Sequence, residues 1–204
     1  TSGTFSLYYR YIKGRGSHVL HHHPKLLHRQ GKPNVIIPIV EHTEAAILQK
    51  AAEFSTLSAD CVEWRVDCFE GAKDLSAIAR CVAKLRVALK DKLFLVTFRT
   101  KAEGGNVELT HEEYLRFLHT VLDTDCADLL DIEFFSAGER LSQWIAAAHA
   151  AGVKVVCSSH DFQKTPPRAE LVERMVRMQQ ARADLPKLGE QAHSAGVTVG
   201  CSSH

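Results

Sequence analysis

The sequence predicts an α/β fold of the (β/α)8 TIM-barrel type, and three observations support this class. Short apolar runs rich in β-branched residues alternate with longer segments in which apolar residues recur at three- and four-residue spacing. The apolar runs follow one another at intervals of about 30 residues, as repeated βα units in a parallel sheet do. No GxGxxG motif follows the first run, which disfavours a dinucleotide-binding domain and leaves a doubly wound sheet as the structural alternative.

Several short segments of the chain have the length and composition of strands. They are residues 34–40, 61–67, 93–99, 128–134, 154–160 and 183–188. Pro38 in the first segment has no backbone N–H group and so removes one hydrogen-bond donor from the sheet. Because a closed barrel of this type has eight strands, we expect an incomplete barrel of six to seven strands.

The segments between the strands have the apolar period of amphipathic helices. They are residues 43–57, 75–90, 110–124, 137–152 and 168–182. Thr110 and Glu113 have the spacing of a capping box at the start of the third segment. Gly152 follows the fourth segment, where a glycine commonly ends a helix.

Length and composition fit a single globular domain. A chain of 204 residues can bury a full core, and 45% of the residues are hydrophobic and 24% charged. The net charge of +1 disfavours nucleic acid or an anionic membrane as partner, and no apolar run is long enough for a membrane-spanning helix. We expect one barrel domain over residues 34–204, which lacks the last strand or strands.

Residues 1–33 differ from the rest of the chain. They carry six lysine or arginine residues and no acidic residue, with the string HVLHHHP in the middle. We expect a basic, poorly ordered N-terminal arm; an organelle transit segment and a metal-binding histidine run are the alternatives. The default expectation for the compartment is the cytoplasm.

The cysteines form no CxxC pair, and several lie in the apolar strand segments. This pattern favours buried, reduced thiols in a cytosolic protein over a disulfide framework or a zinc site. The residues concerned are Cys61, Cys68, Cys81, Cys126, Cys157 and Cys201.

Polar residues gather where the predicted strands end, and this is where parallel α/β folds place their chemistry. In residues 61–67, Glu63, Arg65 and Asp67 alternate with apolar residues, so one face of that strand is ionisable. A buried strand with three charges on one face requires partners or a ligand. A half-exposed edge strand is the alternative explanation.

Four more ionisable residues lie near the ends of later strands: Arg99, Glu103, His160 and Lys187. Taken one at a time, each has a structural explanation. Arg99 and Glu103 could form a surface ion pair, His160 could be a structural histidine with its hydrogen bonds satisfied, and Lys187 could extend its amine to water. Together they predict a reaction site. Arginines bind a carboxylate, a histidine transfers protons, and a lysine near other cations can attack a ketone as the free amine.

Four strings carry a resemblance to a known family. They are EWRVD (63–67), TFR (97–99) with EGG (103–105), SSHDF (158–162) with TP (165–166), and ADLPK (183–187). In this order and spacing, from about residue 34 to 187, the chain resembles the type I 3-dehydroquinate dehydratases. The resemblance implies a barrel enzyme, commonly dimeric, that needs no metal or cofactor. It implies elimination of water from 3-dehydroquinate to give 3-dehydroshikimate through an imine with a lysine.

The resemblance also implies a role for each candidate residue. Lys187 would form the Schiff base, and His160 would be the general acid and base, oriented by Glu103. Substrate binding would fall to Glu63, Arg65 and Arg99. Two alternatives stay open: a non-catalytic barrel of the same family, and an aldolase-like enzyme that also uses a lysine Schiff base.

Two stretches of the chain are nearly the same. Residues 148–160 (AHAAGVKVVCSSH) and 192–204 (AHSAGVTVGCSSH) share ten of thirteen positions. A repeat architecture needs about three or more copies, so we interpret the second stretch as a displaced copy of the strand that bears His160. We expect residues 197–203 to be extended and His204 to be dispensable.

Overall fold

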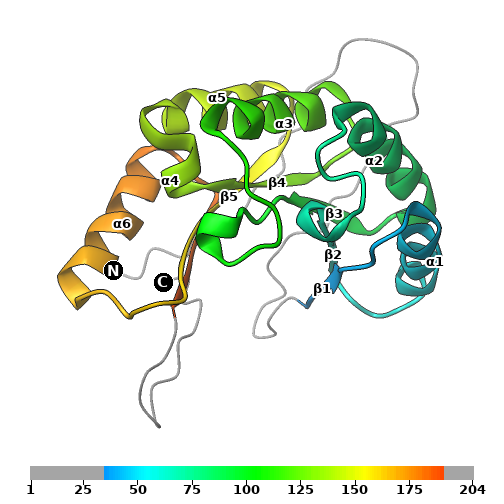
Figure 1. The fold of residues 1–204 in the computed structure, drawn as a ribbon, viewed down its shortest axis with the longest axis horizontal. Coiled ribbons are helices and arrows are strands. Elements are labelled where there is room, and N and C mark those ends of the chain that lie inside the picture. The colour runs from blue at the N-terminus through cyan, green and yellow to red at the C-terminus, as the bar shows by residue number, and fades with distance from the viewer. Residues whose placement is uncertain (1–34, 191–204) are drawn as a thin grey trace, which may run out of the picture.

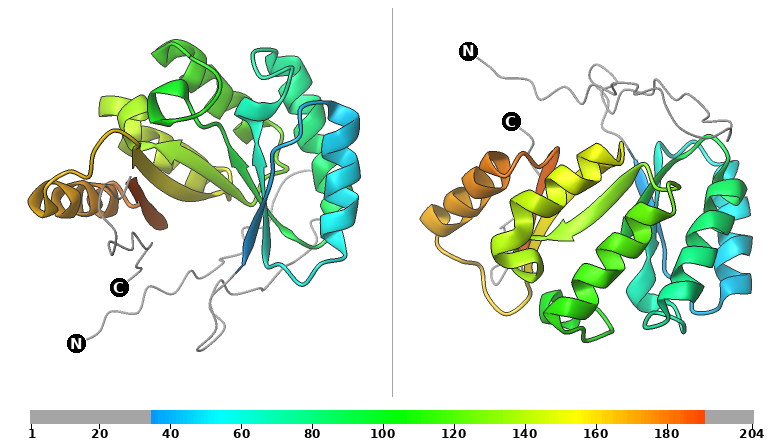
Figure 2. Two further views of the ribbon diagram at one scale, coloured as in Figure 1. Left: turned by 60° about the horizontal axis from the view of Figure 1, so that its bottom comes forward. Right: turned by 90° about the horizontal axis from the view of Figure 1, so that it is seen from above.

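The computed structural model of the protein describes residues 35–190 as one parallel six-stranded sheet. The strands lie side by side in the order in which they occur in the chain, and the sheet curls into a half-barrel with the helices on its outer face (Figures 1 and 2). The predicted fold class is confirmed. The predictions for the arm 1–33, the extended segment 197–203, Cys201 and His204 lie outside the described residues.

All the predicted strands form, with small shifts at their ends. They are β1 (Ile36–Ile39), β2 (Cys61–Arg65), β3 (Leu93–Thr97), β4 (Leu129–Glu133), β5 (Lys154–Asp161) and β6 (Leu185–Glu190). The strand β2 ends before the predicted residue 67 because the chain turns at Val66–Cys68 into a short 3-10 helix. Pro38 lies opposite Glu63 in the pairing of β1 with β2.

Within the described residues, the α-helices of the structure are the five predicted ones and a short one, α4, that was not predicted. They are α1 (Glu44–Ser55), α2 (Leu75–Leu89), α3 (His111–Asp123), α4 (Phe134–Ala137), α5 (Leu141–Ala150) and α6 (Arg168–Gln180). The predicted helix 137–152 begins only at Leu141, because Gly138 takes a φ of 55° and ends α4. None of the helices between residues 35 and 190 is long and apolar enough to cross a membrane.

The predicted helix boundaries at α3 and α5 have the expected local chemistry. The Thr110 hydroxyl accepts from the Glu113 N–H at 3.2 Å, and the Glu113 carboxylate accepts from the Thr110 N–H at 2.7 Å. This is a complete capping box, which satisfies two backbone donors that the helix leaves free. Gly152 follows α5 with a φ of 78°, a conformation that suits glycine.

The two faces of the sheet have different cores. Successive strand residues point to opposite faces, so Val62, Trp64, Phe94 and Ile132 belong to the large core beneath the helices. A smaller apolar cluster uses the other parity and lies on the inner face near the amino ends of the strands. It consists of Cys61, Leu93, Leu95, Leu129 and Val156, with Leu185 packed against it. The same parity continues toward the carboxyl ends with polar residues, and this places the site on the inner face.

The cysteines within the described residues are free thiols, as expected. Cys61, Cys81 and Cys157 are buried, and burial raises the pKa of the Cys61 and Cys81 thiols to about 12. These thiols are therefore protonated and behave as small apolar side chains.

Leu118 of α3 is fully buried in the large core beneath the helices, so its substitution tests the packing of that core. We expect Leu118→Ala to lower the free energy of unfolding by about 2–5 kcal/mol, because it removes buried methyl groups and leaves a cavity. The matched control is Val87→Ala on α2, where the side chain is 78% exposed. Urea unfolding should show a change within about 0.5 kcal/mol for the control. Equal losses in the two variants would contradict the burial assigned to α3.

Candidate functional site

The candidate residues lie on or next to the inner face of the sheet, at the carboxyl ends of its strands. Strand register places His160 and Lys187 close together, because Ser158 of β5 lies opposite Lys187 of β6 and His160 lies opposite Gly189. His160 and Ser158 share one face of β5, since they are two residues apart. Of the other four candidates, Glu63 and Arg65 belong to β2, while Arg99 and Glu103 follow β3.

Glu103 and His160 form a direct pair. The Glu103 Oε2 atom is 3.0 Å from the His160 Nδ1 atom, and it also accepts from the His160 backbone N–H at 3.0 Å. Glu103 is the last residue of a short 3-10 helix (Lys101–Glu103), and Gly104 with a φ of 86° follows it. Opposite an ionised Glu103, the Nδ1 atom carries the imidazole proton, which leaves the lone pair on Nε2. His160 can therefore accept a proton at Nε2.

Burial acts on both members of this pair. Burial lowers the pKa of His160 to about 4, and the charges of Arg99 and Lys187 act in the same direction. Burial raises the pKa of Glu103 to about 7, although Arg99 opposes the shift. The Glu103 Oε1 atom is buried, and it has no hydrogen-bond partner within the described part of the chain. The imidazole is thus neutral at physiological pH, as a proton acceptor must be.

Arg99 is the centre of a buried charge cluster. Its guanidinium donates to Glu133 at 2.9 Å, to Ser158 at 2.9 Å and to Asp131 at 3.0 Å. Burial opposes the positive charge, but the neighbouring carboxylates hold the Arg99 pKa above its ordinary value. A longer contact of 3.4 Å joins Arg99 to Glu103. The cluster therefore connects the ends of β3, β4 and β5 to the Glu103–His160 pair.

Asp131 and Glu133 are two buried site residues that the sequence interpretation missed. Both are fully buried, and Asp131 also accepts from the Ser158 hydroxyl at 2.6 Å. Burial opposes ionisation of Asp131, but the charges of Arg99 and Lys187 keep its pKa below the ordinary value. The signal that could have found them is their alternation with Leu130 and Ile132, which repeats the pattern seen in residues 61–67.

Glu63 and Arg65 form a second group on β2. The Arg65 guanidinium donates to both carboxylate oxygens of Asp67, at 2.8 and 2.9 Å, and Glu63 accepts from the Thr97 hydroxyl at 2.7 Å. Asp67 also accepts from the Arg99 backbone N–H at 3.3 Å, which links this group to the first. Because β2 lies between β1 and β3, the alternative of a half-exposed edge strand is wrong.

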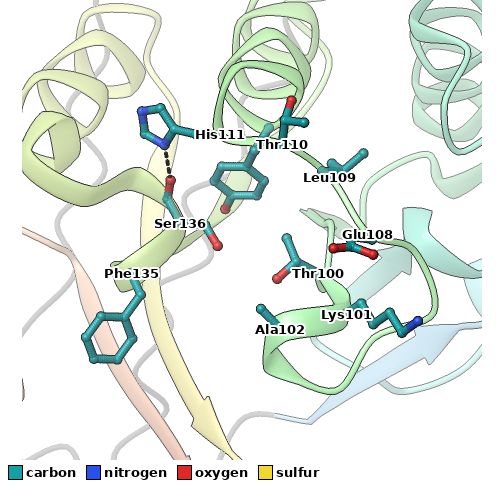
Figure 3. A pocket seen from close by; sticks show the side chains of 10 residues that line it. Thr100, Lys101, Ala102, Glu108, Leu109, Thr110, His111, Phe135 and Ser136 are labelled. Atoms are coloured by element: carbon teal, nitrogen blue, oxygen red, sulfur yellow. Dashed lines mark hydrogen bonds between the residues drawn. The ribbon is translucent and has the colours of Figure 1, made fainter.

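A hollow of about 410 Å³ lies beside the charge cluster, between the segments that follow β3 and β4 (Figure 3). Its lining residues are Thr100, Lys101, Ala102, Glu108, Leu109, Thr110, His111, Tyr114, Phe135 and Ser136. The six candidate residues are not among them. Thr100 and Ser136 nevertheless both donate to the Glu133 carboxylate, so the hollow borders the charge cluster on the side of Glu133.

Comparison with known proteins gives consistent results. The family described as type I 3-dehydroquinase matches residues 35–196. The chain is 43% identical over 159 residues to a 3-dehydroquinate dehydratase from Bacillus subtilis, and this match covers 78% of the chain and 62% of that protein. The chain thus spans less than two thirds of the length of that relative.

Solved structures show the same similarity. A 3-dehydroquinate dehydratase from Enterococcus faecalis has a TM-score of 0.76 at 38% identity, covering 79% of this chain and 67% of that one. A type I 3-dehydroquinate dehydratase from Clostridium difficile, with covalently modified comenic acid, has a TM-score of 0.77 at 34% identity. That similarity covers 81% of this chain and 65% of the other.

The raised pKa of Glu103 predicts a pH-dependent effect of Glu103→Gln on stability. Between about pH 7 and 4.5 the folded state holds a proton on Glu103 that the unfolded state has released, so this group stabilises the fold more as the pH falls. The variant lacks this contribution. We expect the stability of the variant relative to the wild type to fall by about 3 kcal/mol between pH 8 and pH 4.5, measured by urea unfolding.

The control for this measurement is Glu173→Gln, because Glu173 is an exposed glutamate of α6. Its stability relative to the wild type should be nearly independent of pH over the same interval. A difference between wild type and Glu103→Gln that does not change with pH would show that Glu103 has an ordinary pKa in the folded state.

Proposed function

Because the chain belongs to the type I 3-dehydroquinase family, we propose that it eliminates water from 3-dehydroquinate to give 3-dehydroshikimate. The observation that carries the proposal is the Glu103–His160 pair beside Lys187 at the carboxyl ends of β5 and β6. A lysine amine next to a neutral imidazole is the set of groups that an elimination through an imine requires. The names of the relatives support the same reaction.

Lys187 is the proposed nucleophile. Its Nζ atom forms a bond to the ketone carbon of the substrate, and the ketone oxygen leaves as water. The resulting iminium withdraws electrons from the neighbouring carbon C2, so the C2 proton becomes acidic enough for an imidazole to remove. Hydrolysis of the product iminium then returns the free amine of Lys187.

His160 is the proposed general base and acid. Its Nε2 atom takes the C2 proton, the electron pair forms the new C=C bond, and the hydroxyl on the adjacent carbon leaves with a proton from the same imidazole. The low pKa of His160 keeps Nε2 unprotonated at the start of this step. Glu103 accepts the Nδ1–H hydrogen bond and so orients the ring.

Glu63, Arg65 and Arg99 are the proposed substrate-binding residues. Glu63 and Arg65 are partly exposed, and they can contact hydroxyl and carboxylate groups of the substrate directly. Arg99 is only 5% exposed and donates to buried carboxylates, so we place it beneath the substrate.

We further propose that the protein acts in the cytoplasm, as a homodimer, without a metal or cofactor and without nucleic acid or membrane partners. Free thiols at the described cysteines support a reducing compartment. The small net charge of +1 supports the absence of a polyanionic partner. The homodimer rests on the family resemblance, and sedimentation velocity of the full chain would test it.

Reductive trapping tests the proposed reaction. We expect incubation of the wild-type protein with 3-dehydroquinate and borohydride to leave a reduced adduct on Lys187, identified by mass spectrometry of peptides. Lys187→Met should form no adduct, and His160→Ala should lower kcat by about 10²–10⁴-fold, because both proton transfers lose their carrier.

Circular dichroism and thermal unfolding must show that each variant is folded. A folded wild-type protein that binds 3-dehydroquinate but forms neither adduct nor product would instead support the non-catalytic alternative. Cleavage of a carbon–carbon bond in an aldol substrate would support the aldolase-like alternative.

A further inference from the structure

The Glu133 carboxylate is one of the most completely bonded groups in the described part of the chain. Its Oε1 atom accepts from the Arg99 guanidinium at 2.9 Å and from the Thr100 N–H at 2.9 Å. Its Oε2 atom accepts from the Thr100 hydroxyl at 2.8 Å and from the Ser136 hydroxyl at 2.5 Å. A carboxylate offers about four lone-pair positions, so these donors use all of them. Glu133 is therefore held in one orientation as an ionised acceptor.

The backbone of Glu133 is fixed as well. Its N–H group donates to the hydroxyl of Tyr114, a fully buried residue of α3, at 2.8 Å. Burial, together with the neighbouring charge of Glu103, raises the pKa of Glu133, and Arg99, Ser136 and Thr100 oppose this shift. Glu133 has the inward parity of β4, but its side chain is fully buried beneath that face, where its carboxylate binds Arg99, Thr100 and Ser136.

Glu133 and Glu103 compete for the same nitrogen of Arg99. The Arg99 Nη1 atom is 2.9 Å from Glu133 Oε1 but 3.4 Å from Glu103 Oε2, which is long for a hydrogen bond. The Glu103 Oε2 atom meanwhile accepts both bonds from His160. Asp131 cannot replace Glu133 as a partner of Nη1, since it already binds Arg99 Nη2 and the Ser158 hydroxyl.

We propose that Glu133 is a positioning residue, which holds the Arg99 guanidinium away from Glu103 and so reserves the Glu103 Oε2 atom for the imidazole of His160. Without the Glu133 charge, the nearest carboxylate to Nη1 that still has a free oxygen is Glu103, through its unpartnered Oε1 atom. A two-point Arg–carboxylate contact is stronger than a contact to a neutral donor. Glu103 would turn toward Arg99, and His160 would lose the acceptor that selects its Nδ1–H tautomer.

The tautomer of His160 gives a direct test with side-chain ¹⁵N NMR of histidine-labelled protein. The His160 signals are assigned by their loss in His160→Gln. We expect the wild type to show the Nδ1–H tautomer above pH 7, and Glu133→Gln to show a mixture of the two tautomers. Glu133→Asp, which retains the charge, should recover part of the wild-type signal. A folded Glu133→Gln protein with the wild-type tautomer would overturn the proposal.

Two further variants complete the design. Asp128→Asn is the matched control, because Asp128 is a partly buried carboxylate that binds Arg86 at 2.7 Å outside the charge cluster. It should leave the His160 tautomer unchanged. If Glu133→Gln does not fold, the His160 tautomer is measured in Ser136→Ala instead, because this variant removes one hydrogen-bond donor from Glu133. We expect a smaller shift in the same direction, and no shift would contradict the proposal.

The kinetic part of the inference rests on the proposed function. We expect Glu133→Gln to lower kcat by about 10²-fold, as a small misplacement of a reacting group does, with little change in KM. A raised KM at unchanged kcat would overturn the positioning role in favour of substrate binding. Because the tautomer measurement needs no substrate, an inactive wild-type protein would contradict the proposed function and still leave the role of Glu133 open to test.

Discussion

The buried positive charge of Arg99 is the constraint on which the arrangement of this protein depends. An arginine that is 5% exposed requires counter-charges, because an isolated buried ion is strongly destabilising. The structure provides them from β4, through Asp131 and Glu133, and from the segment after β3, through Glu103. These contacts bring the carboxyl ends of three neighbouring strands into one hydrogen-bonded unit. The polar half of the inner face is therefore a rigid network and not a set of independent side chains.

The rest of the fold supports this network from the other side of the sheet. The large apolar core beneath the helices uses the strand residues of one parity, and the charge cluster uses the other. A strand that is firmly packed on its outer face cannot slip by one residue without exposing that core. Register then controls the distance between groups on β5 and β6, so Lys187 and His160 are placed by strand pairing and not by loops.

Burial also shifts the pKa values of the groups at the edge of the Arg99 cluster. His160 and Glu103 lie where the network meets the inner face, and burial shifts their pKa values in opposite directions. Both shifts favour the uncharged form of each group, next to a cluster that already contains several charges. A neutral imidazole with a fixed ring orientation follows from the position of the pair and needs no special property of the histidine itself.

The order and type of nearly all the elements could be predicted from the sequence, as could the family resemblance carried by the four motif strings. Local periodicity records which way a side chain points along its own segment, and the strand ends together with the motif strings led to the prediction of six site residues: Glu63, Arg65, Arg99, Glu103, His160 and Lys187. It was not enough to show that Asp131 and Glu133 contact Arg99, or that a short helix, α4, forms before Gly138. These points depend on the tertiary structure. Distances between separate segments depend on the relative positions of strands and on the packing of helices against them, and neither is encoded in the period of a single segment.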